Sequence, residues 1–355
     1  MVDWTDLTTM KALLLSQYRH LELTDVPDPS PGPDEALIRV AACGICGSDV
    51  HGYDGSSGRR IPPIVMGHEA AGTVAAVGSG VKGLDPGDRV TFDSTVYCGQ
   101  CSHCRAGNVN LCDQRQVLGV SCGDYRRSGA FAELVAVPSH IVYKLPENLS
   151  FAEAAMLEAV AVAIHAVSLV PVPPGSSGLV LGAGTIGLLV QQALRVEGCS
   201  QVFVADVDRT RLKLSEQLGA SAVLSSGPGL AEEIMRLTGG RGVDIAVEAV
   251  GITETITAAI DCVGKGCNVV LVGNISPQVT IPLQKVVTRQ LRLQGSCASA
   301  GEYPRAIELM SSGQIRVKPL ISAIAPLAEG ARWFERLYAR EPNLMKVVLA
   351  PGSLT

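Results

Sequence analysis

A chain of 355 residues exceeds the size at which a single hydrophobic core usually stops growing, so we expect two domains. Its 47% hydrophobic and 18% charged residues are typical of a globular protein and exclude a disordered one. The formal net charge of −5 argues against broad binding to nucleic acid or to anionic membranes. The apolar piece Ala12–Leu15 is too short for a signal-peptide core or a membrane span, which predicts a soluble, cytoplasmic protein.

Short β-like runs separated by Pro and Gly turns fill the chain to about residue 150. The first strand is expected to start at Met10, and further runs cover 35–43, 70–78, 88–92 and 130–138. Many short strands with frequent turns predict a compact, barrel-like β unit. The first nine residues, MVDWTDLTT, are interpreted as a loose extension.

Around Ser150 the pattern changes to helices and then to alternating strands and helices. Ser150 followed by Glu153 is a capping-box pattern, which predicts one long helix to about residue 170. The expected strands that follow cover 178–184, 201–206, 243–251 and 268–273, with helices over 185–198, 209–219 and 253–264 between them. This alternation predicts a doubly wound parallel α/β sheet. Beyond residue 298 we expect one helix, 302–313, and a terminal strand, 346–351.

A glycine motif follows the first strand of this second part. The run Gly182-Ala183-Gly184-Thr185-Ile186-Gly187 is a GxGxxG motif that opens a helix. The glycines allow a tight turn and close backbone approach, and the helix N-terminus presents free N–H groups to a pyrophosphate. The motif alone is weak, but its position between strand and helix predicts a dinucleotide site.

The end of the next strand carries Asp206, whose carboxylate would accept hydrogen bonds from the adenosine ribose and repel a 2′-phosphate. NAD is therefore favoured over NADP. Arg211 keeps NADP possible, because a nearby guanidinium could tolerate the 2′-phosphate of that cofactor. The alternative is that Asp206 only begins a loop and caps the following helix.

Eleven cysteines are a high count, and four of them lie together in YCGQCSHCRAGNVNLC. Cys98, Cys101, Cys104 and Cys112 follow a C-x2-C-x2-C-x7-C spacing, and four thiolates suit a tetrahedral structural zinc with every coordination position filled. The alternatives are an iron–sulfur cluster, a pair of disulfides or free thiols. Ferredoxin-type spacing differs after the third cysteine, and disulfides do not suit a cytoplasmic chain. His103 is interpreted as a bystander.

The segment GICGSDVHGY, residues 44–53, crowds several reactive side chains into one turn: Cys46, Ser48, Asp49 and His51. A structural turn needs the glycines but has no use for a thiol or an imidazole. A second glycine-rich segment, GHEAAGTVAAVGSGV, begins at residue 67 with another imidazole. Spacing alone does not assemble residues this far apart.

Taken together, these motifs resemble those of the zinc-dependent medium-chain dehydrogenase/reductase family, and most of all its polyol (sorbitol-type) dehydrogenase branch. The resemblance covers nearly the whole chain from Met10. It rests on GICGSDVH, on GHEAAGTVAAVGSGV continuing to DPGDRV, on the four-cysteine lobe, on MLEAVAVAIHA and on GAGTIG with Asp206. It implies a Rossmann domain over 157–297 and a mostly β, GroES-like catalytic domain over 1–156 and 298–355, with the zinc lobe at 97–113.

The resemblance places a catalytic zinc on Cys46, His68 and a carboxylate. Glu69 belongs to the family's GHE motif, and Glu158 matches the acidic position of the polyol branch. Which of the two binds is left open. Such a mixed site keeps a coordination position for the substrate oxygen, and the zinc then acts as a Lewis acid.

The same resemblance assigns the rest of the crowded turn. Ser48 would take the substrate proton, and His51 would be a later member of the proton relay, although His51 also suits a simple turn residue. Asp49 would orient a zinc-ligand imidazole. Two other reactive side chains are expected to be structural: Cys43 as a strand residue packed in the core, and His165 as a core residue on an apolar helix.

The resemblance also implies cofactor contacts beyond the glycine motif, at Val272, Gly273, Asn274, Ser296 and Cys297. Relatives are commonly homodimers or homotetramers that pair sheets through the nucleotide domain, where CNVVLVG and LRLQGS are candidate segments.

For the substrate, the polyol branch implies a secondary alcohol with a neighbouring hydroxyl, in a sugar alcohol or related sugar, that is oxidised to the ketone. Ala298 stands where this branch carries an arginine that can hold substrate hydroxyls. A sugar phosphate, a vicinal diol or threonine therefore stay open, and the alternatives are an L-threonine 3-dehydrogenase or a butanediol dehydrogenase. A remote alternative is an inactive nucleotide-binding regulatory relative.

Overall fold

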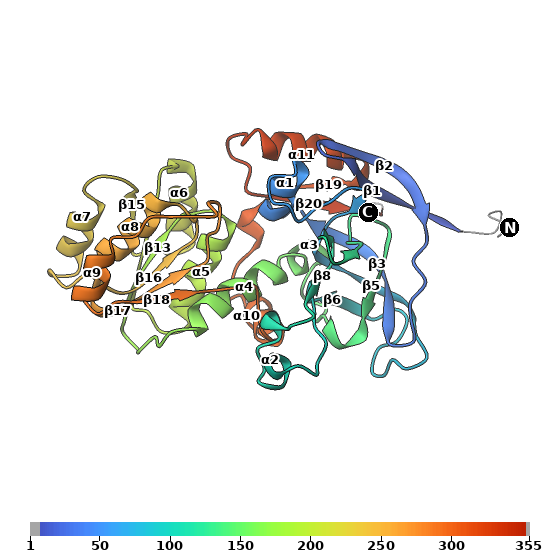
Figure 1. Ribbon diagram of the computed structural model, residues 1–355, viewed down its shortest axis with the longest axis horizontal. Coiled ribbons are helices and arrows are strands. Elements are labelled where there is room, and N and C mark those ends of the chain that lie inside the picture. Colours follow the sequence, from blue (N-terminus) through green and yellow to red (C-terminus); the bar gives the residue numbers. More distant parts are fainter. Residues whose placement is uncertain (1–7, 353–355) are drawn as a thin grey trace. The chain divides into compact units, whose positions relative to one another are not determined.

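The computed structural model describes residues 8–352 and divides the chain into two compact units (Figure 1). The first unit contains the chain up to Glu158, Tyr303–Ser311 and the chain from Leu320 on. The second contains Ala159–Glu302 and Ser312–Pro319. The expected extension at residues 1–9 lies outside the described residues except for its last two positions, and Thr9 already belongs to the first strand.

The division differs from the expected one after residue 297, because 298–302 and 312–319 belong to the second unit. Hydrogen bonds explain this assignment. The Gln192 side chain donates to the Arg316 carbonyl oxygen at 3.2 Å and accepts from its backbone N–H at 2.8 Å. The His165 Nδ1 lies 2.7 Å from Glu302 Oε1, within the second unit.

The first unit is mostly β. Its strands are β1 (Thr9–Gln17), β2 (His20–Pro27), β3 (Glu35–Gly44), β4 (Ile64–Val65), β5 (Glu69–Val77), β6 (Arg89–Phe92), β7 (Thr95–Val96), β8 (Gln116–Val117), β9 (Val120–Ser121), β10 (Arg126–Arg127), β11 (Leu134–Pro138), β12 (Val142–Lys144), β19 (Ile321–Pro326) and β20 (Lys346–Ala350). Its helices are α1 (Gly47–Tyr53), α2 (Ser102–Arg105), α3 (Phe151–Ala154), α10 (Tyr303–Ser311) and α11 (Gly330–Tyr338).

The central strand of this unit is β3. In the largest sheet the strands run β12-β6-β5-β3-β20-β19, and β11 also pairs with β3. The first half of β3 pairs with β11 and its last two residues pair with β20, while β5 runs along its other side. Buried and less buried positions alternate along most of β3, as in a strand with one face turned to the core.

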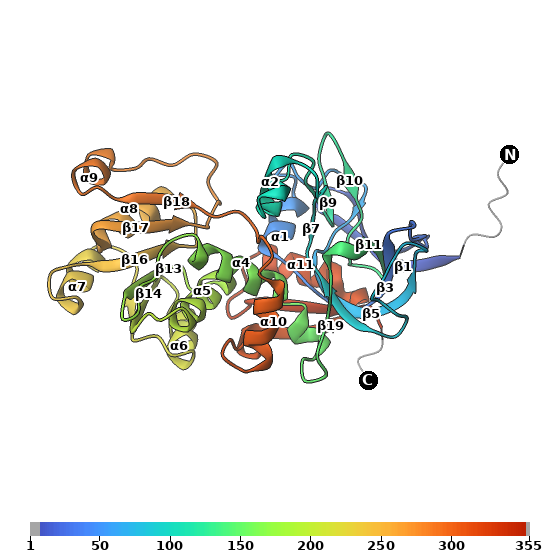
Figure 2. The ribbon, with the colours of Figure 1, turned by 90° about the horizontal axis from the view of Figure 1, so that it is seen from below.

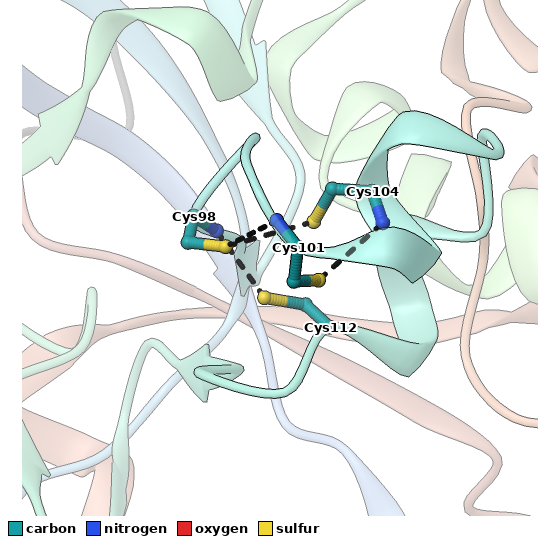
Figure 3. A group of neighbouring side chains, drawn as sticks. All are labelled: Cys98, Cys101, Cys104 and Cys112. Carbon is teal, nitrogen blue, oxygen red and sulfur yellow. Dashed lines mark hydrogen bonds between the residues drawn. The ribbon is translucent and has the colours of Figure 1, made fainter.

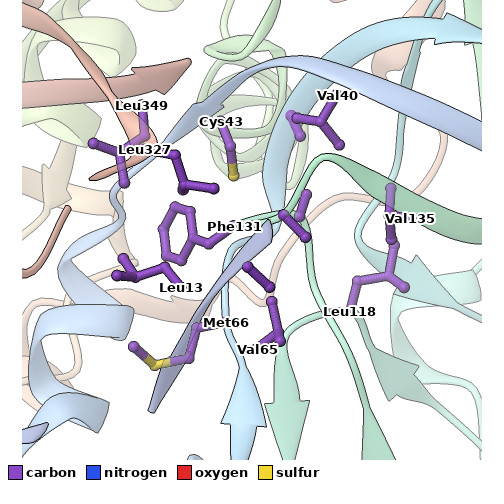
Figure 4. Packing of buried hydrophobic residues seen from close by; sticks show 14 of the residues in the cluster. Leu13, Val40, Cys43, Val65, Met66, Leu118, Phe131, Val135, Leu327 and Leu349 are labelled. Atoms are coloured by element: carbon purple, nitrogen blue, oxygen red, sulfur yellow. The ribbon is translucent and has the colours of Figure 1, made fainter. Parts of the chain in front are cut away.

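The core of the first unit gathers around Phe131 (Figure 4). This ring is fully buried beside Leu13, and it packs edge-on against Phe334 at a centroid distance of 5.7 Å. Cys43 is also fully buried in this core, as predicted. Truncating an aromatic ring of this kind costs about 3–5 kcal/mol, so the cluster is a large part of what holds the β unit together.

The second unit is a doubly wound parallel sheet, which confirms the predicted fold class. The strand order is β15-β14-β13-β16-β17-β18, and all neighbours are parallel. The elements are β13 (Ser177–Leu181), α5 (Thr185–Val196), β14 (Gln201–Asp206), α6 (Arg209–Gln217), β15 (Ala222–Ser225), α7 (Leu230–Leu237), β16 (Val243–Glu248), α8 (Thr253–Cys262), β17 (Val263–Leu271), α9 (Leu283–Thr288) and β18 (Arg292–Gly295), preceded by α4 (Leu157–Ser168). Figure 2 shows this sheet with helices packed along it.

The predicted helix over 150–170 is two helices in the structure. Ser150 does cap the first one, since its hydroxyl accepts from the Glu153 N–H and the Glu153 carboxylate accepts from the Ser150 N–H, each at 3.3 Å. The first helix, α3, ends at Ala154, and α4 begins at Leu157 after a two-residue turn. The structure also adds β15, α7, β19 and α11, which the sequence pattern did not reveal. None of the described helices is long and apolar enough to cross a membrane.

Candidate active site

Strand register brings the two glycine-rich segments together. Gly44, the last residue of β3, pairs with Glu69, the first residue of β5. Cys46 follows Gly44 by two residues and His68 directly precedes Glu69, so both side chains lie at the same end of the strand pair. A β-carbon at Gly44 would lie 2.4 Å from Glu69 Oε2, so a larger residue there would displace the Glu69 carboxylate.

A thiol, an imidazole and a carboxylate converge there. Ligand atoms of Cys46, His68 and Glu69 all lie within 4.8 Å of one another. His68 and Glu69 are buried, and Cys46 is half-buried. This mixed sulfur, nitrogen and oxygen set fits zinc, and three protein ligands leave a coordination position for a substrate. The donor set thus fits a catalytic zinc, and the assignment stays a prediction.

Asp49 lies behind the imidazole. Its Oδ1 is 3.3 Å from His68 Nδ1, and its Oδ2 accepts a hydrogen bond from the Cys46 N–H at 3.3 Å. Burial alone would raise the pKa of the fully buried Asp49 carboxyl, but the charges of His68 and Arg60 hold it well below its ordinary value. Asp49 is therefore an anion whose position suits the predicted orientation of the imidazole.

Ser48 and His51, the predicted relay residues, have different surroundings. The Ser48 Oγ lies 3.5 Å from His68 Nε2, at the edge of the candidate zinc site. His51 lies on the exposed side of α1, and its ring forms no hydrogen bond with any described residue. The structure thus brings Ser48 to the site, while the part played by His51 stays a prediction.

The two candidate carboxylates are held differently. Glu69 accepts from the Lys346 ammonium through both oxygens, at 2.8 and 2.6 Å, and both side chains are buried. Glu158 lies outside the group of three converging side chains among the described residues. Burial, with the nearby charges of Glu69 and Asp93, raises the pKa of Glu158 to about 7, and His68 acts against this rise.

Sequence reasoning missed Lys346 and Arg60, two buried cations of the site. Lys346 is the first residue of β20 and lies 277 positions from Glu69 in the chain. Arg60 is 4% exposed and contacts Asp49 and Ser48. The only sequence signal was a charged residue directly before an apolar run, KVVLA in one case and RIPPIV in the other.

The four cysteines of the lobe form a second cluster (Figure 3). The thiols of Cys98, Cys101, Cys104 and Cys112 lie within 4.8 Å of one another, and α2 begins directly after Cys101. N–H groups of Gln100 and Cys101 donate to the Cys98 sulfur at 3.4 Å and lower the pKa of that thiol to about 6. None of the eleven cysteines, all of which lie in the described part of the chain, forms a disulfide. Four thiol groups at this separation, with N–H groups aimed at their sulfurs, fit a closed tetrahedral zinc site.

In the second unit the glycine motif has the geometry that a pyrophosphate needs. Gly182 has a φ of 97°, in the left-handed region, and Gly184 directly precedes α5. A β-carbon at Gly187 would lie 1.7 Å from the Gly182 carbonyl oxygen, so the helix approaches the loop only because this residue is glycine. The N–H groups at the start of α5, at Thr185 and Ile186, are therefore open to an anion.

Asp206 ends β14 and holds this loop in place. Its Oδ2 accepts from the Ala183 N–H at 2.5 Å, and its Oδ1 accepts from the Asp208 N–H at 2.8 Å. The residue that caps α6 is Asp208, so capping does not explain Asp206. Arg211 lies on α6 and pairs with Asp208 at 3.6 Å. Next to Asp206, Val207 is 82% exposed, an apolar surface that the sequence pattern did not single out.

The remaining predicted cofactor residues follow the ends of two neighbouring strands. Val272, Gly273 and Asn274 come after β17, and Ser296 and Cys297 come after β18. Because all these strands are parallel, their carboxyl ends lie at the same edge of the sheet as the glycine motif, where such sheets bind nucleotides. The buried Ser296 Oγ has no hydrogen-bond partner among the described residues. The second unit therefore fits a dinucleotide.

Comparison with known proteins identifies the family of the chain. A family model described as "Alcohol dehydrogenase GroES-like domain" matches residues 32–147, and one described as "Zinc-binding dehydrogenase" matches residues 185–312. Sorbitol dehydrogenase of Bacillus subtilis (strain 168) is 34% identical over 349 residues, which is 97% of this chain and 98% of that protein.

Solved structures extend the similarity to three dimensions. An oxidoreductase/dehydrogenase of unknown specificity from Escherichia coli matches with a TM-score of 0.92 at 33% identity, over 98% of this chain and 100% of that one. A zinc-binding dehydrogenase from Sinorhizobium meliloti 1021, bound to NADP, matches with a TM-score of 0.87 at 32% identity, over 97% and 100%. The chain therefore belongs to the zinc-dependent medium-chain dehydrogenase/reductase family, in its polyol dehydrogenase branch.

Proposed function

We propose that the protein oxidises a secondary alcohol of a polyol or related sugar to the ketone and transfers the hydride to NAD. The convergence of Cys46 and His68 beside the Ser48 hydroxyl, with Glu69 and Glu158 as the two candidates for a third ligand, carries this proposal. Similarity to a sorbitol dehydrogenase over nearly the whole chain supports the polyol class.

We assign the catalytic zinc to Cys46, His68 and one carboxylate. Zinc bound there supplies a Lewis acid for the alcohol oxygen. Glu158 is our first choice for the carboxylate ligand, because both oxygens of Glu69 are already held by the Lys346 ammonium. A divalent cation close to Glu158 would favour its charged form and reverse the effect of burial on its pKa. The four-cysteine cluster would hold a second, structural zinc.

Proton transfer is assigned to Ser48. Its Oγ is at the edge of the zinc ligand set, where it would accept the proton of the substrate hydroxyl and pass its own proton on. His51, three residues further along the same helix and exposed to solvent, would pass the proton to water. Asp49 would keep the His68 ring turned so that Nε2 faces the metal.

We propose NAD as the cofactor. A nicotinamide dinucleotide supplies the hydride acceptor, and the protein binds and orients it. Asp206 is buried at the loop that would meet the adenosine ribose, where its charge would repel a 2′-phosphate. Arg211 is engaged with Asp208 and so is less available to a phosphate. A similar dehydrogenase from Sinorhizobium meliloti is bound to NADP, so NAD and NADP are compared directly in the experiment below.

Two further properties follow as proposals. The protein is a homodimer or homotetramer, because β18 is an edge strand of the parallel sheet and such a strand can pair with a second copy. Its compartment is the cytoplasm, because a chain with eleven cysteines and no disulfide among its described residues suits a reducing environment.

The test is a substrate panel with purified, zinc-loaded protein. Polyols, sugar phosphates, vicinal diols and threonine are offered with NAD or NADP, and reduced cofactor is followed by absorbance. We expect the highest kcat/KM with a polyol and NAD. A response to threonine or butanediol alone would replace the substrate class, and absence of turnover with every alcohol would favour a regulatory nucleotide-binding protein.

A further inference from the structure

Arg60 is a buried cation of the first unit with an unusual number of hydrogen bonds. Its side chain is 4% exposed, and its guanidinium makes four hydrogen bonds. Nε and Nη2 donate to Asp49 Oδ1 at 3.3 and 2.9 Å, and Nη2 also donates to Ser48 Oγ at 3.3 Å. Nη1 donates to the Arg59 carbonyl oxygen at 3.1 Å. One buried fork therefore joins the two neighbouring side chains on which the proposed proton transfer and imidazole orientation depend.

The space for the Arg60 side chain depends on a glycine, Gly52, in helix α1. Gly52 lies in the last turn of α1, where glycine has a lower helix propensity than alanine. Its φ is not in the left-handed region, so backbone conformation does not require glycine there. A β-carbon at Gly52 would lie 2.1 Å from Arg60 Cγ and 2.9 Å from Arg60 Cβ. The Arg60 side chain occupies the space that a side chain at position 52 would fill, and this allows its guanidinium to contact Ser48.

The contact constrains the Ser48 hydroxyl. A hydroxyl oxygen has two acceptor lone pairs and one donor proton. Arg60 Nη2 occupies one lone pair, which leaves the other to accept a substrate proton and leaves the Ser48 proton to be passed on. Without Arg60, the hydroxyl would be free to rotate among its staggered positions.

We infer that Arg60 is a positioning residue of the reaction: through the space left by Gly52, its guanidinium fixes the Ser48 hydroxyl in the orientation that accepts the substrate proton. This inference rests on the proposed function, in which Ser48 is the proton acceptor. It also explains why an arginine is buried here: the planar guanidinium presents donors on separate nitrogens in a rigid fork, whereas a lysine offers a single nitrogen on a flexible stem and would not fix Asp49 and Ser48 in the same geometry.

Arg60→Lys is the direct test, because it keeps the charge opposite Asp49 and removes the fork. Gly52→Ala is the second test, because it displaces Arg60 without changing any polar group. Each is expected to lower kcat per bound zinc on the order of 10- to 100-fold, with KM changed less than about 3-fold and a larger solvent deuterium isotope effect on kcat. The double variant should lose little more than either single variant, because both act through the same guanidinium.

Arg59→Lys is the matched control, since this neighbouring arginine is exposed and its side chain contacts no described part of the site. It is expected to keep the parent kcat and isotope effect. Zinc content and melting temperature are measured for all variants. A loss confined to zinc content or melting temperature, with kcat per zinc and the isotope effect unchanged, would show a purely structural role and overturn the inference.

A crystal structure of Arg60→Lys separates this inference from the proposed function. If the parent protein oxidises no alcohol, the proposed function fails, and the Ser48 side chain still decides the positioning claim. A changed or divided Ser48 rotamer in the variant supports it, and an unchanged single rotamer overturns it.

Discussion

Replacing Lys346 by methionine would leave the Glu69 carboxylate buried without its cation. The ammonium lies 2.8 and 2.6 Å from the two carboxylate oxygens, and the side chains are 4% and 1% exposed. Removing one partner of a buried ion pair costs about 3–5 kcal/mol, because the remaining charge has lost both water and its counter-ion. We therefore expect Lys346→Met to lower the free energy of unfolding of the first unit by about this amount.

The assay is urea unfolding of zinc-saturated protein, followed by the fluorescence of Trp333, which packs against the core of the first unit. Lys11→Met is the matched control, because Lys11 also lies 2.8 Å from a carboxylate, that of Asp25, but both side chains are more than half exposed. The control should lose less than about 1 kcal/mol. A loss for Lys346→Met as small as that of the control would refute the reasoning, and Glu69→Gln added to Lys346→Met should restore part of the stability.

Three further results are expected. Cys101→Ser should reduce the zinc content by one ion per chain and lower the melting temperature, measured by metal analysis and calorimetry; an unchanged content would contradict a metal in the four-cysteine cluster. Asp206→Gly should weaken binding of NAD relative to NADP about 10- to 100-fold, measured by fluorescence titration, and an unchanged ratio would remove Asp206 from cofactor selection. Burial alone would raise the pKa of Glu302, but the hydrogen bond with His165 lowers this pKa below its ordinary value of 4.5. The Glu302 carboxylate therefore stabilises the fold above pH 4.5, and this stabilisation is lost as the pH falls through the pKa of Glu302 in the folded protein. The melting-temperature advantage of the parent over Glu302→Gln should thus be full near about pH 6 and shrink below about 4.5, and an advantage that grew towards acid would contradict the pairing.

The parts of the site that sequence reasoning predicted are those whose chemistry is local. The four cysteines lie within fifteen positions, and the glycine motif sits between one strand and one helix, so spacing alone indicates a cluster and a phosphate loop. Asp49 follows Cys46 by three residues at the start of α1, and its carboxylate accepts from the Cys46 N–H. In each case the interacting residues are close together in the sequence.

The rest depends on tertiary contacts. Lys346 reaches Glu69 because β20 pairs with the end of β3, and no local pattern in KVVLA indicates that pairing. Arg60 reaches Ser48 only because residue 52 is glycine and leaves space inside the unit. The pairing of Gly44 with Glu69, which gathers the zinc ligands, is likewise a property of strand register, and it entered the prediction only through family resemblance.

The prediction of helix and strand bounds was wrong where the hydrophobic periodicity was ambiguous. The helix expected over 150–170 is interrupted at 155–156, and no Gly or Pro in FAEAAMLEAV marks the break. The strand β17 begins at Val263, five residues earlier than expected, because the glycines in VGKGC belong to the strand and not to a loop after α8. The helix α11 begins at Gly330 without a side-chain cap, so it lacked the start signal that identified α3.

The most direct test of the catalytic-metal assignment is anomalous diffraction at the zinc edge from crystals grown with NAD. We expect two peaks per chain: one inside the four-cysteine cluster, and one about 2.3 Å from the Cys46 sulfur and about 2.0–2.1 Å from His68 Nε2. A single peak confined to the cysteine cluster, or a second metal bound away from Cys46 and His68, would contradict the account.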